Sequence, residues 1–387
     1  MIYGVQVMNS VIANLKGSAS MELMQMANRL KAEGKDIINL AGGEPDFSTP
    51  QRISEALFQS IRNGDTHYAV GTGISELKER IARKIFDDNR ITANPDQVIV
   101  TPGSKYAIYL SIATLINPGD EVVVLNPSWV SYAPMIEACR GKAVSVELSA
   151  DNNFAITEEC LIPALSEKTK AIIINFPNNP TGKVLSEADS LVLQKILDKY
   201  DLYIISDEIY EKIIYDAFLH IAPGSWNDYS DRVITVNGFS KSYAMTGWRI
   251  GYLVASKKIT EAMSKLFAHT ITGIPPFVQK AACIAFDCEK EVEEMVAEYQ
   301  SRRNYFVSNL NEVPFFSCNY PEGSFYAWVK VDSEYDSFAF SKILLEKTGI
   351  VGVPGQAYGA TEHPFIRFSF ANSRDALEES IGRLKQF

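Results

Sequence analysis

The sequence predicts an α/β protein with a large, mostly parallel sheet domain and a smaller α+β domain. Short runs rich in valine and isoleucine recur through the middle of the chain without strict alternation, as in strands buried on both faces of a parallel sheet. Longer amphipathic stretches separate these runs, which is typical of a layered strand–helix domain. The last third of the chain differs, because it combines a long charged helical pattern with isolated strand-like runs.

Six apolar runs are expected to form the strands of the large sheet. They are residues 97–101 (QVIVT), 121–127 (EVVVLNP), 171–177 (AIIINFP), 202–210 (LYIISDEIY), 232–240 (RVITVNGFS) and 251–256 (GYLVAS). Between them, residues 105–116 and 186–200 are expected to be helices. The second opens with Ser186 and has an acidic first turn, as a helix start should.

The remaining elements place a second domain at the end of the chain. Residues 288–310 form a long, highly charged helical pattern, followed by a strand over 325–331, a helix over 338–347 and a strand over 365–371. We therefore predict a large domain at residues 46–285. The small domain is predicted to combine residues 1–45 with 286–387. These boundaries are defined to within several residues.

Composition narrows the class of protein. With 387 residues, 46% hydrophobic and 22% charged, the chain is neither disordered, collagen-like nor a coiled coil. The net charge is −10, from 37 basic and 47 acidic residues, so no nucleic-acid partner is expected. No apolar run approaches 18 residues and no secretory signal is visible, so we expect no membrane contact.

The cysteines and histidines suggest a reducing compartment and no metal. Five cysteines occur at irregular spacings without a CxxC pair, which favours the cytoplasm over a disulfide framework. Four scattered histidines form no HExxH pair, so a metal site is not expected.

Polar clusters follow four of the predicted strands. They are residues 126–129 (NPSW), 177–182 (PNNPTG), 207–210 (DEIY) and 240–242 (SKS). Because ligands bind beyond the carboxyl ends of parallel strands, the four clusters should face one crevice. A fifth turn, residues 102–105 (PGSK), precedes a helix and offers backbone N–H groups to an anion. Taken alone, this turn could equally carry its glycine for packing.

Five motifs resemble the class I/II pyridoxal-phosphate aminotransferases of fold type I. They are residues 42–47 (GGEPDF), 101–107 (TPGSKYA), 178–182 (NNPTG), 206–210 (SDEIY) and 239–251 (FSKSYAMTGWRIG). The matches run in family order up to Arg367, so the resemblance covers essentially the whole chain. It implies an enzyme with pyridoxal 5'-phosphate as cofactor, in a cytoplasmic homodimer.

The resemblance assigns five residues to the cofactor ring. Lys241 would be the Schiff-base lysine and would then carry the proton between the substrate α-carbon and the cofactor. Asp207 would keep the pyridine nitrogen protonated. Tyr210 and Asn179 would donate to the ring hydroxyl oxygen, and Trp129 would stack on the ring. The catalytic residues are thus expected to be Lys241, Asp207 and Tyr210.

The resemblance also assigns the phosphate site. The backbone N–H groups of residues 103–105, a hydroxyl and a guanidinium would bind the phosphate, while a tyrosine would reach the phosphate of the neighbouring subunit. These residues are Gly103, Ser104, Lys105, Ser240, Arg249 and Tyr68. The position of Tyr68 implies an active site that is shared between two chains.

Substrate binding is implied by a further set of matches. Arg367 would grip the α-carboxylate through a bidentate pair, and Gly43 would offer backbone to the same group. Trp129 and Asn179 would border the substrate as well. In a bacterial subgroup of aspartate aminotransferases, basic residues at the positions of Lys105 and Lys16 bind a distal carboxylate; the alternative is a solvated Lys105 whose N–H alone is used.

We therefore expect transamination between an L-amino acid, with aspartate or another diacid preferred, and a 2-oxo acid such as 2-oxoglutarate. The kinetics would be ping-pong, through pyridoxamine phosphate. One departure leaves alternatives open, because Gly273 and Ile274 stand where many aspartate-specific members carry Ser-Asn. An aromatic, alanine-like or specialised substrate, or a lyase or oxidase reaction, would use the same fold and cofactor.

Overall fold

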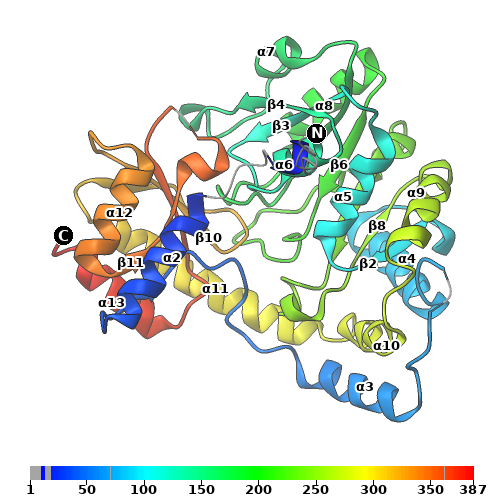
Figure 1. Cartoon of the computed structure of the whole chain (residues 1–387), viewed down its shortest axis with the longest axis horizontal. Coiled ribbons are helices and arrows are strands. Elements are labelled where there is room, and N and C mark those ends of the chain that lie inside the picture. The colour runs from blue at the N-terminus through cyan, green and yellow to red at the C-terminus, as the bar shows by residue number, and fades with distance from the viewer. Residues whose placement is uncertain (1–9, 14–18, 70, 361) are drawn as a thin grey trace, which may run out of the picture.

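The computed structural model describes residues 10–13, 19–69, 71–360 and 362–387, shown in Figure 1. Its largest feature is a seven-stranded sheet of order β2-β8-β7-β6-β5-β3-β4. The strands are β2 (Val98–Thr101), β3 (Glu121–Asn126), β4 (Lys142–Glu147), β5 (Thr169–Asn175), β6 (Tyr203–Asp207), β7 (Val233–Gly238) and β8 (Gly251–Val254).

The large sheet is mostly parallel, as predicted. Strands β4, β3, β5, β6 and β7 pair in parallel in that order, and only β8 runs antiparallel to its two neighbours, β2 and β7. The reversal matters for the site, because β8 begins where the parallel strands end. Gly251 pairs with both Thr101 and Gly238, so the residues just before β8 reach the edge where ligands bind.

All six predicted strands are present, and β4 is an addition. Its sequence, KAVSVE, alternates between apolar and polar residues, because this strand lies at the edge of the sheet beside β3 alone. Because β4 has no continuous apolar run, the sequence pattern did not predict it.

Helices cover both faces of the large sheet. On β5, Ile173 packs into one core, with residues of α5 (Ser104–Leu115), α6 (Tyr132–Ala138) and α9 (Lys257–Thr270). Ile172 and Ile174 pack into the opposite core, with α7 (Glu158–Leu161) and α8 (Glu187–Lys199). A third core lies by β2 and β8 under α3 (Gln51–Arg62), α4 (Ser75–Asn89) and α10 (Pro276–Ala285).

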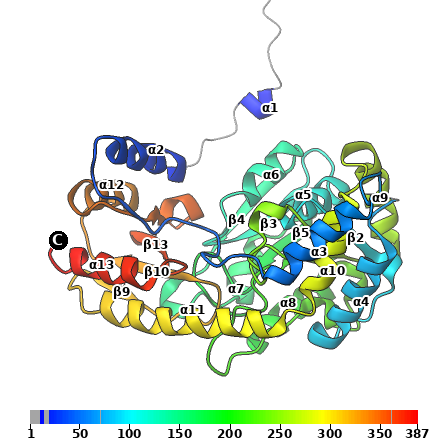
Figure 2. The same cartoon turned by 90° about the horizontal axis from the view of Figure 1, so that it is seen from below.

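The smaller sheet is antiparallel, with the order β12-β13-β10-β9. Its strands are β9 (Phe316–Cys318), β10 (Tyr326–Val331), β12 (Val353–Pro354) and β13 (Phe365–Ser369), with α12 (Ser337–Thr348) and α13 (Arg374–Leu384) around them. β1 (Ile38–Asn39) pairs in parallel with β11 (Ile350–Val351), which ties the N-terminal part to this domain. Helix α2 (Ala19–Ala32) packs on α12, as Figure 2 shows.

Two features join the sheets. Helix α11 (Glu289–Leu310) runs along one side of the molecule from the small sheet toward α10 (Figure 2). The core of the small domain also contains Tyr210 and Ile213, which follow strand β6 of the large sheet. The residue boundaries of the two domains remain the prediction given above.

The described part of the chain, which includes the short helix α1 (Ser10–Ala13), has no helix long and apolar enough to cross a membrane. All five cysteines lie within it as free thiols.

Candidate active site

A cavity of about 680 Å³ opens at the carboxyl ends of the large sheet's parallel strands, facing the small domain. Eleven residues singled out from the sequence line it: Gly43, Ser104, Lys105, Trp129, Asn179, Asp207, Tyr210, Ser240, Lys241, Arg249 and Arg367. Gly103 lies against the guanidinium of Arg249. Tyr68 is 90% exposed and does not line the cavity of its own chain. Lys16 lies outside the described residues.

The turn before α5 is shaped for close approach. Gly103 has φ +81°, which favours glycine, and a Cβ there would lie 2.8 Å from Nη2 of Arg249 and force that side chain to shift. The first N–H groups of α5 have no acceptor within the helix. Arg249 reaches this turn because it precedes the reversed strand β8, and its Nη1 donates to the carbonyl of Thr246 (2.8 Å). These donors form an anion site.

Lys241 is the amine at the centre of the cavity. Its Nζ donates to the carbonyl of Gly43. Burial, and then repulsion by Arg367, lower the pKa of Lys241 to about 8, against the weaker pull of Glu44 and Asp207. Near pH 8 much of this amine is therefore neutral and able to act as a nucleophile or a base.

Asp207 ends strand β6 and is buried. Its Oδ2 accepts from the hydroxyl of Tyr132 (2.7 Å) and its Oδ1 from the N–H of Ile209 (3.3 Å). Burial raises the pKa of Asp207 to about 6, although both hydrogen bonds act to lower it. A buried carboxylate without a cation hydrogen-bonded to it is suited to a positively charged ligand group.

Arg367 is a buried cation without a carboxylate partner among the residues described. Nη1 donates to Oδ1 of Asn179 (2.9 Å) and Nη2 to the carbonyl of Ala41 (2.7 Å), while Nε has no acceptor in that part of the chain. Because an unpaired buried charge is costly, the side chain is suited to an incoming carboxylate. The bond also fixes the amide of Asn179, whose nitrogen is left to donate elsewhere.

Two aromatic rings, those of Trp129 and Tyr132, line one part of the cavity. The ammonium of Lys105 lies 4.8 Å from the ring centroid of Trp129, and that ring packs edge-on against Tyr132 at 5.3 Å. Partial burial and the charge of Arg249 lower the pKa of Lys105. A cationic group thus lies beside the aromatic ring that the sequence analysis placed at the cofactor.

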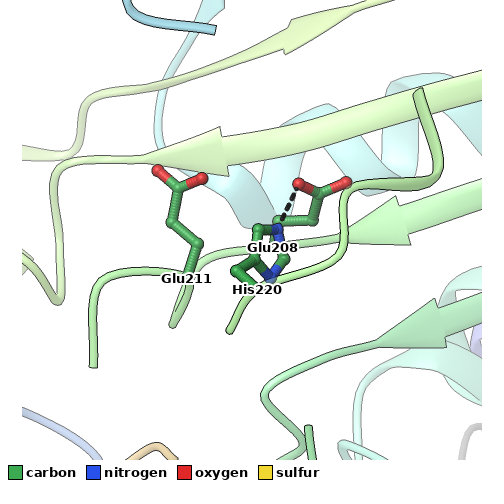
Figure 3. Close-up of side chains that lie close together, drawn as sticks. All are labelled: Glu208, Glu211 and His220. Carbon is green, nitrogen blue, oxygen red and sulfur yellow. Dashed lines mark hydrogen bonds and ion pairs between the residues drawn. The ribbon is translucent and has the colours of Figure 1, made fainter. Parts of the chain in front are cut away.

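A second group of ionisable side chains, shown in Figure 3, follows strand β6. Glu208 Oε2 lies 2.7 Å from Nε2 of His220. Glu211 lies nearby, and its carboxylate points away from the His220 ring. Glu211 is bound by the ammonium of Lys84 and by Nδ2 of Asn89 (2.6 Å). These donors are of metal-ligating types, but Lys84 already supplies the cation that Glu211 needs.

Sequence reasoning missed several residues of the cavity. Asn175 donates to the carbonyl of Asp207 (2.8 Å) and accepts from the N–H of Asn179 (2.9 Å). Tyr132 holds the carboxylate of Asp207, and Tyr326 and Tyr358 lie beside Arg367. Asn175 could have been found as the polar end of a buried strand. The tyrosines stand in no motif of the sequence, and only the tertiary packing identifies them.

Comparison with known proteins identifies the family. A model of "Aminotransferase class I and II" matches residues 35–384. The aspartate aminotransferase of Bacillus subtilis (strain 168) is 39% identical over 384 residues, 97% of each chain. The crystal structure of an aspartate aminotransferase from Thermotoga maritima gives a TM-score of 0.93 at 38% identity, covering 98% of this chain and 99% of that one. The crystal structure of an aromatic aminotransferase from Pyrococcus horikoshii gives a TM-score of 0.89 at 37% identity, covering 93% of this chain and 98% of that one.

The chain belongs to the class I and II aminotransferases and has their fold type I architecture. Enzymes of this class use pyridoxal 5'-phosphate, and amino acids and 2-oxo acids are their substrates. The cavity fits that cofactor, since it joins an anion site at α5, a buried carboxylate and an amine with a lowered pKa.

Proposed function

We propose that this class I and II aminotransferase moves the amino group of aspartate or another diacid to a 2-oxo acid such as 2-oxoglutarate. The two half-reactions would follow ping-pong order. The observation that carries the proposal is the pair of cations, Arg367 and Lys105, that line one cavity with the amine of Lys241. A substrate with two carboxylates would meet both cations.

The chain's own residues would hold the cofactor in three places. The backbone N–H groups of residues 103–105, Ser240 and Arg249 would bind the phosphate. Trp129 would stack on the ring, and Asp207 would hold the pyridine nitrogen protonated. Tyr210 and Asn179 would donate to the ring hydroxyl oxygen, for which Asn179 has a free amide nitrogen because its oxygen accepts from Arg367.

Proton transfer would fall to Lys241. When bound, the cofactor withdraws electrons from the substrate α-carbon and so makes its hydrogen acidic. Lys241 would take that proton on Nζ and pass it to the cofactor, because its lowered pKa leaves much of the amine neutral near pH 8. Arg367 would orient the α-carboxylate, and Gly43 would let the chain approach closely.

The substrate assignment can be tested at Lys105. Replacing Lys105 with serine keeps the backbone N–H and removes the ammonium. We expect kcat/KM for aspartate to fall by about 10- to 100-fold, the loss of one charge-assisted contact, and that for tyrosine to change little. The conservative variant Lys105→Arg should keep most of the aspartate activity. Equal losses for both amino acids would contradict a role of Lys105 in diacid binding.

An aromatic substrate is the second candidate, favoured by the Pyrococcus horikoshii relative and by the departure at Gly273. A Cβ at Gly273 would lie 3.4 Å from the carbonyl of Ala69, next to the exposed Tyr68. Ile274 is buried in the core beside β2 and β8. Neither residue lines the cavity of its own chain, so this segment would act only on the site of a partner subunit.

A homodimer is part of the proposal. Tyr68 is the most exposed large apolar side chain among the residues described, and we propose that it reaches the phosphate site of the partner subunit. Lys16, which lies outside the described residues, is retained as a proposed contact of the substrate.

A further inference from the structure

Tyr326 lies at the meeting point of the two halves of the site. It is the first residue of β10 and is 1% exposed, and its side chain lines the cavity. The backbone of Tyr326 is fixed by pairing with Ser369 on β13, the strand that also carries Arg367. Its position is therefore set by the small sheet, whereas its hydroxyl contacts the large domain.

The hydroxyl of Tyr326 contacts Tyr210. The two oxygens lie 2.8 Å apart, with either able to donate. If Tyr210 donates its only proton to the cofactor, it can only accept from Tyr326. A Cβ at Gly43 would lie 3.4 Å from the same hydroxyl. A Tyr326 hydroxyl that donates to Tyr210 would leave the Tyr210 proton to the cofactor.

The ring of Tyr326 contacts Arg367. Cζ of the guanidinium lies 4.1 Å from the ring centroid, compared with 5.3 Å for the ring of Tyr358. A guanidinium held over an aromatic face in a buried site is stabilised by the ring and kept in a defined plane. That plane determines how the two nitrogens can meet a carboxylate.

We propose that Tyr326 is a positioning residue that couples the substrate carboxylate site to the cofactor site, through its ring on Arg367 and its hydroxyl on Tyr210. This rests on the proposed function, which places Tyr210 at the cofactor and Arg367 at the substrate. The charged groups that face the pair are Arg367 from β13, Asp207 from β6 and Lys241 after β7. None of them is altered by the substitutions below.

Two substitutions distinguish the hydroxyl of Tyr326 from its ring. Tyr326→Phe removes only the hydroxyl, and Tyr326→Leu also removes the ring. Tyr358→Phe is the matched control, because it removes the hydroxyl of the other ring beside Arg367, and within the described residues Tyr210 is hydrogen-bonded to Tyr326 and not to Tyr358. Two properties are measured on the purified enzyme with bound cofactor. One is the pH at which the change in its visible absorption is half complete, called the pH midpoint. The other is the Kd of a carboxylate that does not react. This carboxylate is succinate or 3-phenylpropionate, whichever binds the unmodified enzyme more tightly.

We expect Tyr326→Phe to raise the pH midpoint by about half a unit. Without Tyr326, the hydrogen bond from Tyr210 to the hydroxyl oxygen of the cofactor ring is weaker, so the deprotonated form of that oxygen is less stable. Its carboxylate Kd should change less than about threefold. Tyr326→Leu should show the same midpoint shift and an approximately tenfold higher Kd. Tyr358→Phe should leave the midpoint unchanged.

An unchanged midpoint in Tyr326→Phe, or an unchanged Kd in Tyr326→Leu, would overturn the coupling role while leaving the proposed function intact. A midpoint shift of equal size in Tyr358→Phe would also overturn it. An unmodified enzyme that takes up no cofactor would instead contradict the proposed function, so the two failures are distinguishable.

Discussion

The amine of Lys241 differs from the other lysines in its surroundings. It lines the cavity, donates to the carbonyl of Gly43 and has a pKa lowered to about 8. We predict that Lys241→Ala abolishes transamination and the visible absorption of the Schiff base between enzyme and cofactor, because no other amine of the chain's described part lines this cavity except Lys105. The control is Lys258→Ala, an exposed lysine of α9. Full activity of Lys241→Ala, measured with several amino donors, would refute the assignment.

Asp207 and Tyr132 give a prediction for pH. Burial raises the pKa of Asp207 to about 6 in the free site, and the Tyr132 hydrogen bond acts to lower it. The carboxylate form, which the proposed function places at the cofactor nitrogen, is therefore lost as the pH falls through about 6. Removing the hydroxyl should raise the pKa further. We predict that Tyr132→Phe moves the acid-side loss of cofactor affinity to higher pH.

The measurement is the cofactor Kd of the apoenzyme between pH 5 and pH 8, with Asp207→Asn as the control. That variant cannot titrate at this position, so it reports the titration of the other groups, which include the cofactor phosphate and Lys241. It should also lose several decades in kcat, each decade being about 1.4 kcal/mol of barrier. Coincident pH profiles for Tyr132→Phe and the unmodified enzyme would contradict the role of this hydrogen bond.

At the scale of elements, the turn that begins α5 depends on Gly103. Its φ of +81° strains any other residue, and a Cβ there would displace the guanidinium of Arg249. We predict that Gly103→Ala raises the cofactor Kd at least about tenfold, because Arg249 and the N–H groups must move apart. Gly119→Ala is the control, since its φ is +90° but its Cβ would meet nothing within 4 Å. If both variants bind the cofactor equally well, the contact with Arg249 has no role.

The attachment of α4 to the segment after β6 depends on a buried ion pair. Burial raises the pKa of Glu211, but Lys84, His220 and Asn89 outweigh it and bring the value to about 2. The lowered pKa adds stability above about pH 4.5, and this is lost as the pH falls toward 2. We predict that Lys84→Met costs about 3–5 kcal/mol at pH 7, because Glu211 is left buried and unpaired.

Chemical denaturation of this variant at pH 7 and pH 4 tests the ion pair. The difference in the free energy of unfolding between Lys84→Met and the unmodified protein should be smaller at pH 4, where Glu211 without Lys84 becomes protonated. The double variant Lys84→Met with Glu211→Leu should recover much of the loss, since it removes both charges. A deficit independent of pH would mean that Lys84 acts through packing alone.

For the whole molecule, much of the architecture could be predicted from residue patterns. Four apolar runs with polar endings indicated one crevice, and they do meet at one edge of the large sheet. The edge strand β4 was missed because its polar residues interrupt the apolar run. The contact between Tyr326 on β10 and Tyr210 after β6 joins residues 116 positions apart, and no local pattern signals such a pair.

The proposed dimer gives a prediction for mixed subunits. Lys241→Ala lacks the amine, and Tyr68→Ala lacks the tyrosine offered to the partner. We predict that mixing the two variants restores activity to about a quarter of the unmodified level, since half of the dimers are hybrids with one complete site each. Activity equal to the average of the separate variants would show that each site is built from one chain.

The central claim, an aminotransferase that acts on diacids, is tested most directly by the visible spectrum of the purified enzyme with bound cofactor. L-aspartate, L-glutamate, L-tyrosine and L-alanine are added in turn, followed by 2-oxoglutarate. The account predicts that aspartate or glutamate converts the absorption to the pyridoxamine form at the lowest concentration, and that 2-oxoglutarate restores it. Preferential conversion by tyrosine would contradict the diacid assignment. Release of ammonia or peroxide without any dependence on a 2-oxo acid would contradict transamination itself.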